Sequence, residues 1–98
     1  MAFEIEFTPE ALGDLKALKK NDQGYIVDAI ETQLLHQPAE QTRNRKRLRP
    51  NEVAAWELRI GRFRVLYSVE SESNIVSIEA VGLKIGNLLF VRGREIKL

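Results

Sequence analysis

The chain has 98 residues and a net charge of +1, with 44% hydrophobic and 30% charged residues, a balance typical of one folded domain and not of a disordered or fibrous protein. The absence of cysteine excludes disulfides, thiolate metal sites and cysteine nucleophiles. No apolar run approaches the ~20 residues of a membrane span and no signal-peptide pattern opens the sequence, so we expect a single domain over residues 1–98 that stays in the cytoplasm.

The first predicted element is a strand. Residues 2–7 alternate apolar and acidic side chains, which is the pattern of a half-buried strand. Signals for a helix start follow directly, because Thr8 offers a capping oxygen, Pro9 presets the first helical residue and Glu10 complements the helix N-terminus. The sequence therefore predicts a strand that leads straight into a helix.

Two amphipathic helices are predicted next. Apolar residues from Ala11 to Leu18 recur at helical spacing, and the polar segment 21–24 is expected to break this first helix. A second amphipathic stretch runs from Tyr25 to His36, and Pro38 is expected to stop it. Two helices joined by so short a break favour an antiparallel hairpin.

A basic segment, predicted as a loop, follows the helices. Residues 1–42 carry 3 basic and 8 acidic side chains, whereas residues 43–98 carry 12 basic and 6 acidic ones. Such a run is often only a solvated face, but the planar fork of arginine also suits phosphate oxygens, which makes phosphate the leading ligand class. Five cations fall within seven positions, namely Arg43, Arg45, Lys46, Arg47 and Arg49.

The next stretch predicts a β-hairpin. Gly61 and Arg62 form a two-residue turn signal inside an alternating sequence. Counting outward from this turn places Arg59 directly opposite Arg64. Like charges in that position cost on the order of 0.2–1 kcal/mol. The fold does not need such a pair, but a bound polyanion would stabilise it.

The predicted fold class is α+β. Strands are expected at 54–60, 62–70 and 75–81, and with the N-terminal strand they make a mainly antiparallel four-stranded sheet that carries the two-helix hairpin on one face. Trp56 and Tyr67 would pack opposite each other on that face. The other face is expected to be open to a partner, and it would carry Glu57, Arg59, Arg64, Leu66 and Ser68.

The last residues contain three glycines around a short apolar run. This pattern favours a turn, a short helix near residues 87–92 that ends at Gly93, and an extended tail. Phe90 in this segment could stack on a base or pack into the core. Lys84 is the only lysine near the predicted end of the sheet.

The chemistry of a phosphodiester cut limits the candidates further. Cleavage needs a proton acceptor, a proton donor and stabilisation of negative charge. His36 is the only histidine, and it lies at the predicted end of the second helix, where a surface role is expected. The acidic residues are spread over helix surfaces and strand edges, so we expect no metal and no cofactor. Arginine and lysine remain, and they favour a site that works by electrostatics.

Three segments resemble the RelE/ParE superfamily of small bacterial toxins from type II toxin–antitoxin modules. They are residues 56–60 (WELRI), 62–67 (RFRVLY) and 80–84 (AVGLK). The resemblance spans nearly the whole chain and implies a toxin that a cognate antitoxin silences. In RelE-like members the fold implies a ribosome-dependent endoribonuclease that cuts mRNA, and in ParE-like members it implies inhibition of DNA gyrase without catalysis.

The resemblance also assigns positions. Arg64 corresponds to the phosphate-stabilising arginine of RelE-like enzymes, and Arg59 and Glu57 correspond to two strand lysines, so that Glu57 is a charge reversal. Lys84 corresponds to a second arginine, and Phe90 to a tyrosine implicated in the reaction.

The sequence therefore predicts an mRNA interferase that needs no metal and inhibits translation, with the ribosome, mRNA and an antitoxin as partners. The alternatives are a gyrase inhibitor that uses the same basic face and a nucleic-acid binding protein without catalysis. The expected catalytic residues are Arg59, Arg64 and Lys84. The expected RNA-binding residues are Arg43, Arg45, Lys46, Arg47, Arg49, Arg62 and Phe90.

Overall fold

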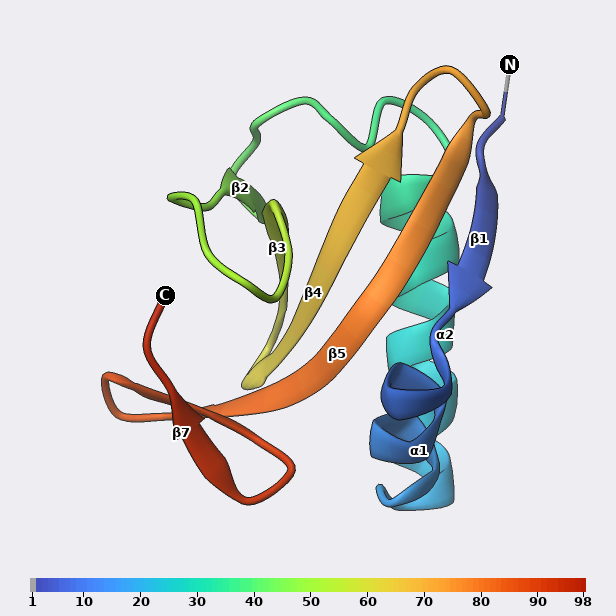
Figure 1. The fold of residues 1–98 in the computed structure, drawn as a ribbon. Coiled ribbons are helices and arrows are strands. Elements are labelled where there is room, and N and C mark those ends of the chain that lie inside the picture. Colours follow the sequence, from blue (N-terminus) through green and yellow to red (C-terminus); the bar gives the residue numbers. More distant parts are fainter. Residues whose placement is uncertain (1) are drawn as a thin grey trace.

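The structure, a computed structural model, describes residues 2–98 and has two helices packed on one face of a twisted sheet (Figure 1). This confirms the predicted α+β class. The elements in chain order are β1 (Glu4–Phe7), α1 (Pro9–Lys16), α2 (Lys20–Leu34), β2 (Arg45–Arg47), β3 (Trp56–Ile60), β4 (Phe63–Glu70), β5 (Ile75–Ile85), β6 (Leu88–Val91) and β7 (Arg94–Ile96).

The sheet contains more strands than the four that the sequence predicts. Neighbouring strands follow the order β2-β3-β4-β5-β6-β7, and β1 pairs with β5 in parallel. The 11-residue strand β5 is long enough to pair with β1 from Ile75 to Ile78 and with β6 from Leu83 to Ile85. Strand β5 thus connects the part of the sheet that the helices cover to the C-terminal strands.

A β-bulge interrupts the ladder between β4 and β5. Leu66 pairs with Ala80 and Tyr67 pairs with Ile78, so Glu79 has no partner across the ladder. Because side chains change face at each residue, one extra residue reverses which positions of β5 face the helices. Ile78 therefore packs on the helix side, while Ala80 packs on the opposite side.

The expected C-terminal helix is wrong. Residues 88–91 form strand β6, which pairs with both β5 and β7. Of the three glycines around this run, Gly82 lies inside β5, whereas Gly86 and Gly93 lie in hairpin turns with φ of 60° and 75°. Arg92, next to Gly93, also has a positive φ of 54°. Two consecutive residues with positive φ form the kind of tight turn that joins antiparallel strands.

The helix boundaries also differ from the expected ones. Helix α1 begins as predicted, with the Thr8 hydroxyl accepting a hydrogen bond from the Ala11 amide. Helix α2 begins at Lys20, however, so the polar segment 21–24 lies inside it and does not break a helix. Gln23 makes this tight connection possible because its side-chain amide donates to the Leu18 carbonyl at 2.7 Å, just beyond the end of α1.

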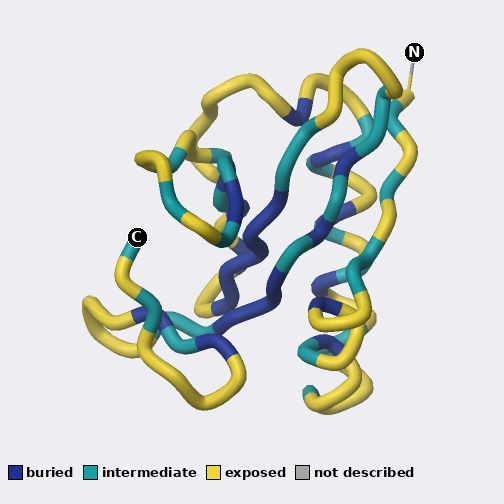
Figure 2. The backbone as a smooth tube through the Cα atoms, in the orientation of Figure 1, coloured by how far each residue is buried: buried dark blue, intermediate teal, exposed yellow. Residues whose placement is uncertain are grey.

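The main core lies between the helices and the sheet. In Figure 2 the buried backbone runs along the central strands and along the inner sides of both helices. Trp56 and Tyr67 pack as predicted, with ring centroids 6.2 Å apart. The fully or almost fully buried residues of this core include Ala11, Ile26, Ile30, Leu34, Leu58, Val65, Tyr67, Val76 and Ile78.

A second, smaller core covers part of the face that was expected to be open. Leu66 is completely buried there, together with Ala80 and Leu89. The segment that joins β2 to β3 supplies Leu48 and Val53, and the C-terminal strands and tail supply Ile96 and Leu98. The expectation of a fully open face is therefore wrong at Leu66, because apolar residues from two distant segments meet over it.

Tyr67 gives a prediction about alkaline stability. Its buried hydroxyl donates to the Pro38 carbonyl at 2.8 Å, and burial raises the pKa of the phenol, an effect that Arg45 opposes. A raised pKa in the folded state means that this stabilisation is complete below pH ~10 and is lost as the pH rises further, by up to about 1.4 kcal/mol per pH unit. Tyr67→Phe should cost about 0.5–1.5 kcal/mol at pH 8, and its deficit relative to wild type should shrink at pH 11.

Urea denaturation at the two pH values measures this difference. Tyr25→Phe is the matched control for the loss of a phenol, because Tyr25 is 54% exposed on α2. A deficit for Tyr67→Phe that is as large at pH 11 as at pH 8 would contradict the prediction.

Candidate functional site

The predicted arginine pair is present in the sheet. Arg59 on β3 is the direct cross-strand partner of Arg64 on β4, and the whole register of this hairpin is as predicted. Arg59 is exposed, whereas Arg64 is only 8% exposed. The two strands therefore present one free guanidinium and one buried guanidinium, where two equivalent ones were expected.

Arg64 is held by its own chain. Its Nη1 donates to the Gly61 carbonyl at 2.7 Å and to the Phe63 carbonyl at 2.8 Å, and its Nε lies 3.8 Å from Glu57 Oε1. Burial lowers the pKa of Arg64, Glu57 opposes this effect and Arg59 reinforces it. The repulsion between the two arginines is thus offset in part by Glu57, and Arg64 stabilises the hairpin turn even without a bound anion.

A polar groove of about 280 Å³ lies beside this pair, and we call it the lysine groove. Strands β2, β3 and β5 and the C-terminal segment meet there. Lys46 faces Glu57 as its cross-strand partner, and the Lys84 amide donates to the Arg62 carbonyl at 2.8 Å, which fixes the backbone of β5 at the groove. The charged lining residues are Lys46, Glu57, Lys84, Glu95 and Lys97.

The remaining members of the basic segment are dispersed. Arg45 reaches to α2 and donates to the carbonyls of Gln33 and His36, while Arg47 lies over the Trp56 ring at 5.6 Å from its centroid.

Arg49 donates to the Leu98 carbonyl at 3.2 Å, whereas Arg43 is exposed. Arg62 pairs with Asp22 at 3.9 Å and lies over the Phe63 ring. Of the five cations in the basic segment, only Lys46 lines the lysine groove.

Phe90 lies in a different groove. This larger groove of about 700 Å³, which we call the α1 groove, runs between α1 and strands β5 and β6 and is mostly apolar. Its lining residues are Pro9, Glu10, Gly13, Asp14, Ala17, Leu18, Phe63, Val81, Gly82, Leu83, Phe90, Arg92 and Gly93. The structure thus separates Phe90 from the lysine groove, although the sequence grouped it with the RNA-binding residues.

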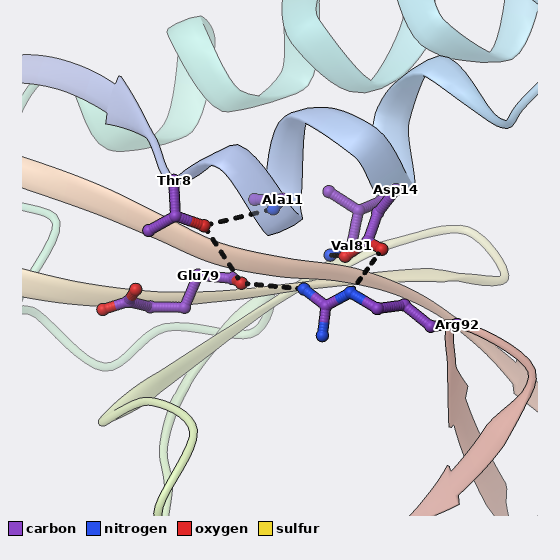
Figure 3. Close-up of polar contacts among 6 residues, drawn as sticks. All are labelled: Thr8, Ala11, Asp14, Glu79, Val81 and Arg92. Carbon is purple, nitrogen blue, oxygen red and sulfur yellow. Dashed lines mark hydrogen bonds and ion pairs between the residues drawn. The ribbon is translucent and has the colours of Figure 1, made fainter.

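An ion pair that the sequence did not reveal borders the α1 groove (Figure 3). The Asp14 side chain is 5% exposed, and its carboxylate lies 2.9 Å from Arg92 Nε and accepts a hydrogen bond from the Val81 amide. Arg92 also donates to the Glu79 carbonyl in the bulge, as does the Thr8 hydroxyl. These bonds attach the C-terminal strands to α1. No local pattern could have predicted them, because they join residues far apart in the sequence.

His36 lies just beyond α2 and is exposed, as predicted. Within residues 2–98, no three His, Asp or Glu side chains lie together as a metal ion would require. In the same part of the chain, no helix is long and apolar enough to cross a membrane.

Residues 5–83 match the family described as the ParE toxin of the type II toxin-antitoxin system, parDE. Among solved structures, the RelBE2 toxin–antitoxin complex of Mycobacterium tuberculosis is similar at 26% identity and a TM-score of 0.71, covering 86% of this chain and 100% of that one. No curated protein matches the chain.

The archaeal RelE–RelB complex of Pyrococcus horikoshii OT3 shares the fold, with 22% identity and a TM-score of 0.65, covering 96% of this chain and 99% of the other. The match of the family to most of the chain, together with these shared folds, shows that this chain belongs to the RelE/ParE superfamily of type II toxin–antitoxin toxins.

Proposed function

We propose that this toxin cuts messenger RNA on the translating ribosome, without a metal ion, and thereby stops translation in the cytoplasm. The lysine groove carries the proposal. Three lysines from separate segments line this one groove, namely Lys46, Lys84 and Lys97. The groove has a size that fits a phosphodiester and its sugar. Exposed Arg59 adds a further cation on the neighbouring strand.

This arrangement suits a polyanion better than it suits a protein core. Three lysines and two glutamates line the groove, so one positive charge has no acidic counterpart there, and long side chains lose conformational freedom when they are ordered. A bound phosphate reverses that cost, since each amine then donates to an anionic oxygen and stabilises negative charge as it develops. The similarity to the RelBE2 toxin–antitoxin complex supports the role of a toxin.

Inhibition of DNA gyrase is the second candidate. The description of the matched family as ParE favours it, and so does Arg64, whose Nη1 donors already bind carbonyls of its own chain. One purified preparation can separate the two functions. The mRNA interferase should truncate message in a translating extract and leave supercoiling by gyrase unchanged. Intact message together with blocked supercoiling would refute the proposal and favour the gyrase inhibitor.

We also propose that a cognate antitoxin binds this chain at the α1 groove. Both similar structures are toxin complexes with RelB proteins. The α1 groove has a volume of about 700 Å³ and is mostly apolar, and it suits an apolar helix or strand of a partner. The exposed Glu10 at its edge would favour a basic residue at the corresponding position of that partner.

Gly13 provides a probe of this surface. A side chain added at Gly13 on α1 would meet no atom within 4 Å, and the residue lines the α1 groove. Gly13→Glu should therefore fold normally but weaken antitoxin binding by about 10-fold or more, because a charge would be buried without a partner. Gly24→Glu is the matched control, because this exposed helical glycine also has open space around it but lies outside the groove.

Calorimetric titration with the antitoxin measures the effect. Equal affinities for both glutamate variants and wild type would exclude the α1 groove as the antitoxin site without affecting the proposal for the lysine groove.

A further inference from the structure

Strand β1 has a partner strand on one side only. Within the part of the chain that the structure describes, β1 pairs with β5 alone, and Figure 1 shows it beside β5 at the margin of the sheet. The Glu4 and Thr8 amides donate to carbonyls on the β5 side, at 2.8 and 3.0 Å. Because the backbone groups of alternate residues point to opposite sides of a strand, those of Ile5 and Phe7 point away from β5. Their amides and carbonyls are therefore available to a further strand.

Strand β2 shows how an outer edge of this sheet can be covered. The amides of Arg45 and Arg47 donate to the side-chain oxygens of Thr42 and Gln41, at 3.2 and 3.4 Å. The Arg45 carbonyl also accepts a hydrogen bond from the Thr42 amide at 2.9 Å. The segment before β2 thus satisfies its outer backbone groups, whereas among residues 2–98 no segment covers β1 in this way.

A groove of about 330 Å³ lies between β1 and α2, and we call it the β1 groove. Its apolar lining consists of Phe3, Ile5, Phe7, Val27, Ile30 and Leu35. It shares no residue with the α1 groove. Because side chains alternate between the two faces of a strand, every second residue of a strand added beside β1 would point into this groove. Apolar residues at those positions would bury their surface there.

Acidic side chains flank the same edge. Glu4 and Glu6 are exposed on the face of β1 opposite the helices, and the exposed Glu31 of α2 borders the β1 groove. None of the three forms an ion pair with another residue in the range 2–98. Charges on an edge strand hinder pairing with a second copy of the same edge, because like charges would then meet. They also repel nucleic acid, but they attract a basic strand.

We propose that β1 is the docking site of a second protein partner, which adds to the sheet an extended segment of alternating apolar and basic residues. The apolar side chains of this segment enter the β1 groove, and the basic ones pair with Glu4 and Glu6. Its backbone forms hydrogen bonds with the outward groups of Ile5 and Phe7. Because the β1 groove and the α1 groove are separate, the antitoxin and this partner bind at the same time. The site does not depend on message cleavage.

A short peptide in which lysine and valine alternate is the probe for this site. Calorimetric titration into the full chain should show binding, and a control peptide that alternates glutamate and valine should bind at least about 10-fold more weakly. At saturation with the lysine peptide, deuterium exchange at the Ile5 and Phe7 amides should slow by about 10-fold or more, with little change at Glu6. Unchanged exchange at Ile5 and Phe7 would overturn the proposal.

Paired charge removals test the acidic flank. The double variant Glu4→Gln, Glu6→Gln should bind the lysine peptide about 10-fold more weakly than wild type. The matched control is Glu52→Gln, Glu95→Gln, which removes the same charge from exposed positions outside β1 and should bind within about twofold of wild type. Equal losses in both double variants would mean that the peptide responds only to net charge, and the proposed site would fail.

The toxin bound to its antitoxin tests whether the two partners are separate. We expect this complex to bind the lysine peptide within about twofold of the free toxin, because the two grooves have no lining residue in common. A complex that excludes the peptide would show that the antitoxin itself covers β1, and it would overturn the assignment of this edge to a second partner.

Discussion

Replacing Lys84 with methionine is expected to reduce message cleavage in a translating extract by about 100- to 1,000-fold, the usual effect of removing one group that stabilises transition-state charge. Lys84 is half-buried in the lysine groove near the end of β5. Methionine preserves most of the stem that packs there and removes only the charged head, so the folded structure should be retained. Truncated message, resolved on a sequencing gel, measures the loss.

Two further variants make this result interpretable. Lys84→Arg retains the charge but gives up a proton far less readily, so its rate should lie between those of wild type and Lys84→Met. Lys16→Met removes a lysine from the exposed last turn of α1, away from the lysine groove, and should leave cleavage unchanged. Full cleavage by Lys84→Met would refute a role for the groove in the reaction.

Gly82→Ala is expected to destabilise the fold by about 1–3 kcal/mol, as overpacking of a closed site does. A Cβ at Gly82 would lie 2.7 Å from the Phe90 carbonyl oxygen and 2.9 Å from Val91 Cγ2. The first of these atoms is backbone, so β6 as a whole would have to move away from β5. Urea denaturation should give a lower midpoint, and the C-terminal amides should exchange faster with deuterium.

Gly13→Ala is the matched control for this change. The same methyl group at Gly13 meets nothing within 4 Å, and alanine is favoured over glycine inside a helix by about 0.5–1 kcal/mol. We therefore expect opposite signs for the two glycine-to-alanine variants. A Gly82→Ala protein as stable as wild type would mean that β6 does not pack against Gly82 as described.

Local sequence signals predicted the parts of the fold that depend on few residues. The register of β3 and β4 follows from the turn at Gly61 and Arg62, because a two-residue turn determines every pair that follows it. The start of α1 likewise depends on two adjacent residues, because Thr8 caps the helix and Pro9 is its first residue. The facing arginines could be predicted because they depend on this local geometry.

Tertiary context decided the parts that the sequence misjudged. A glycine near a short apolar run can end a helix or form a hairpin turn, and at Gly93 the pairing of β6 with β5 selects the turn. Strand β2 was expected to be part of a loop because its residues are charged, but as the last strand beside β3 it can leave them in solvent. The state of Arg64 depends on where the Gly61 and Phe63 carbonyls point, which no pattern of residue types encodes.

The surroundings of Glu57 also depend on tertiary contacts that the sequence pattern does not encode. By position it looked like a charge reversal, and only the fold shows that it lines one groove with Lys46 and Lys84 and lies 3.8 Å from Arg64. Its cross-strand neighbour lies in β2, a strand that the sequence did not predict. Counting along the hairpin alone therefore could not have identified the groove.

The bulge at Glu79 has a consequence for how this family of chains can vary in length. Upstream of Glu79, even-numbered side chains of β5 pack toward the helices, whereas downstream of it Lys84, also even-numbered, lines the lysine groove. Regular alternation over the same number of residues would turn Lys84 toward the helices, whereas deletion of Glu79 would restore regular alternation and leave Lys84 in the groove. A chain that lacked Glu79 would therefore keep its packing residues and its groove lining on their present faces, because the bulge already compensates for this one extra residue.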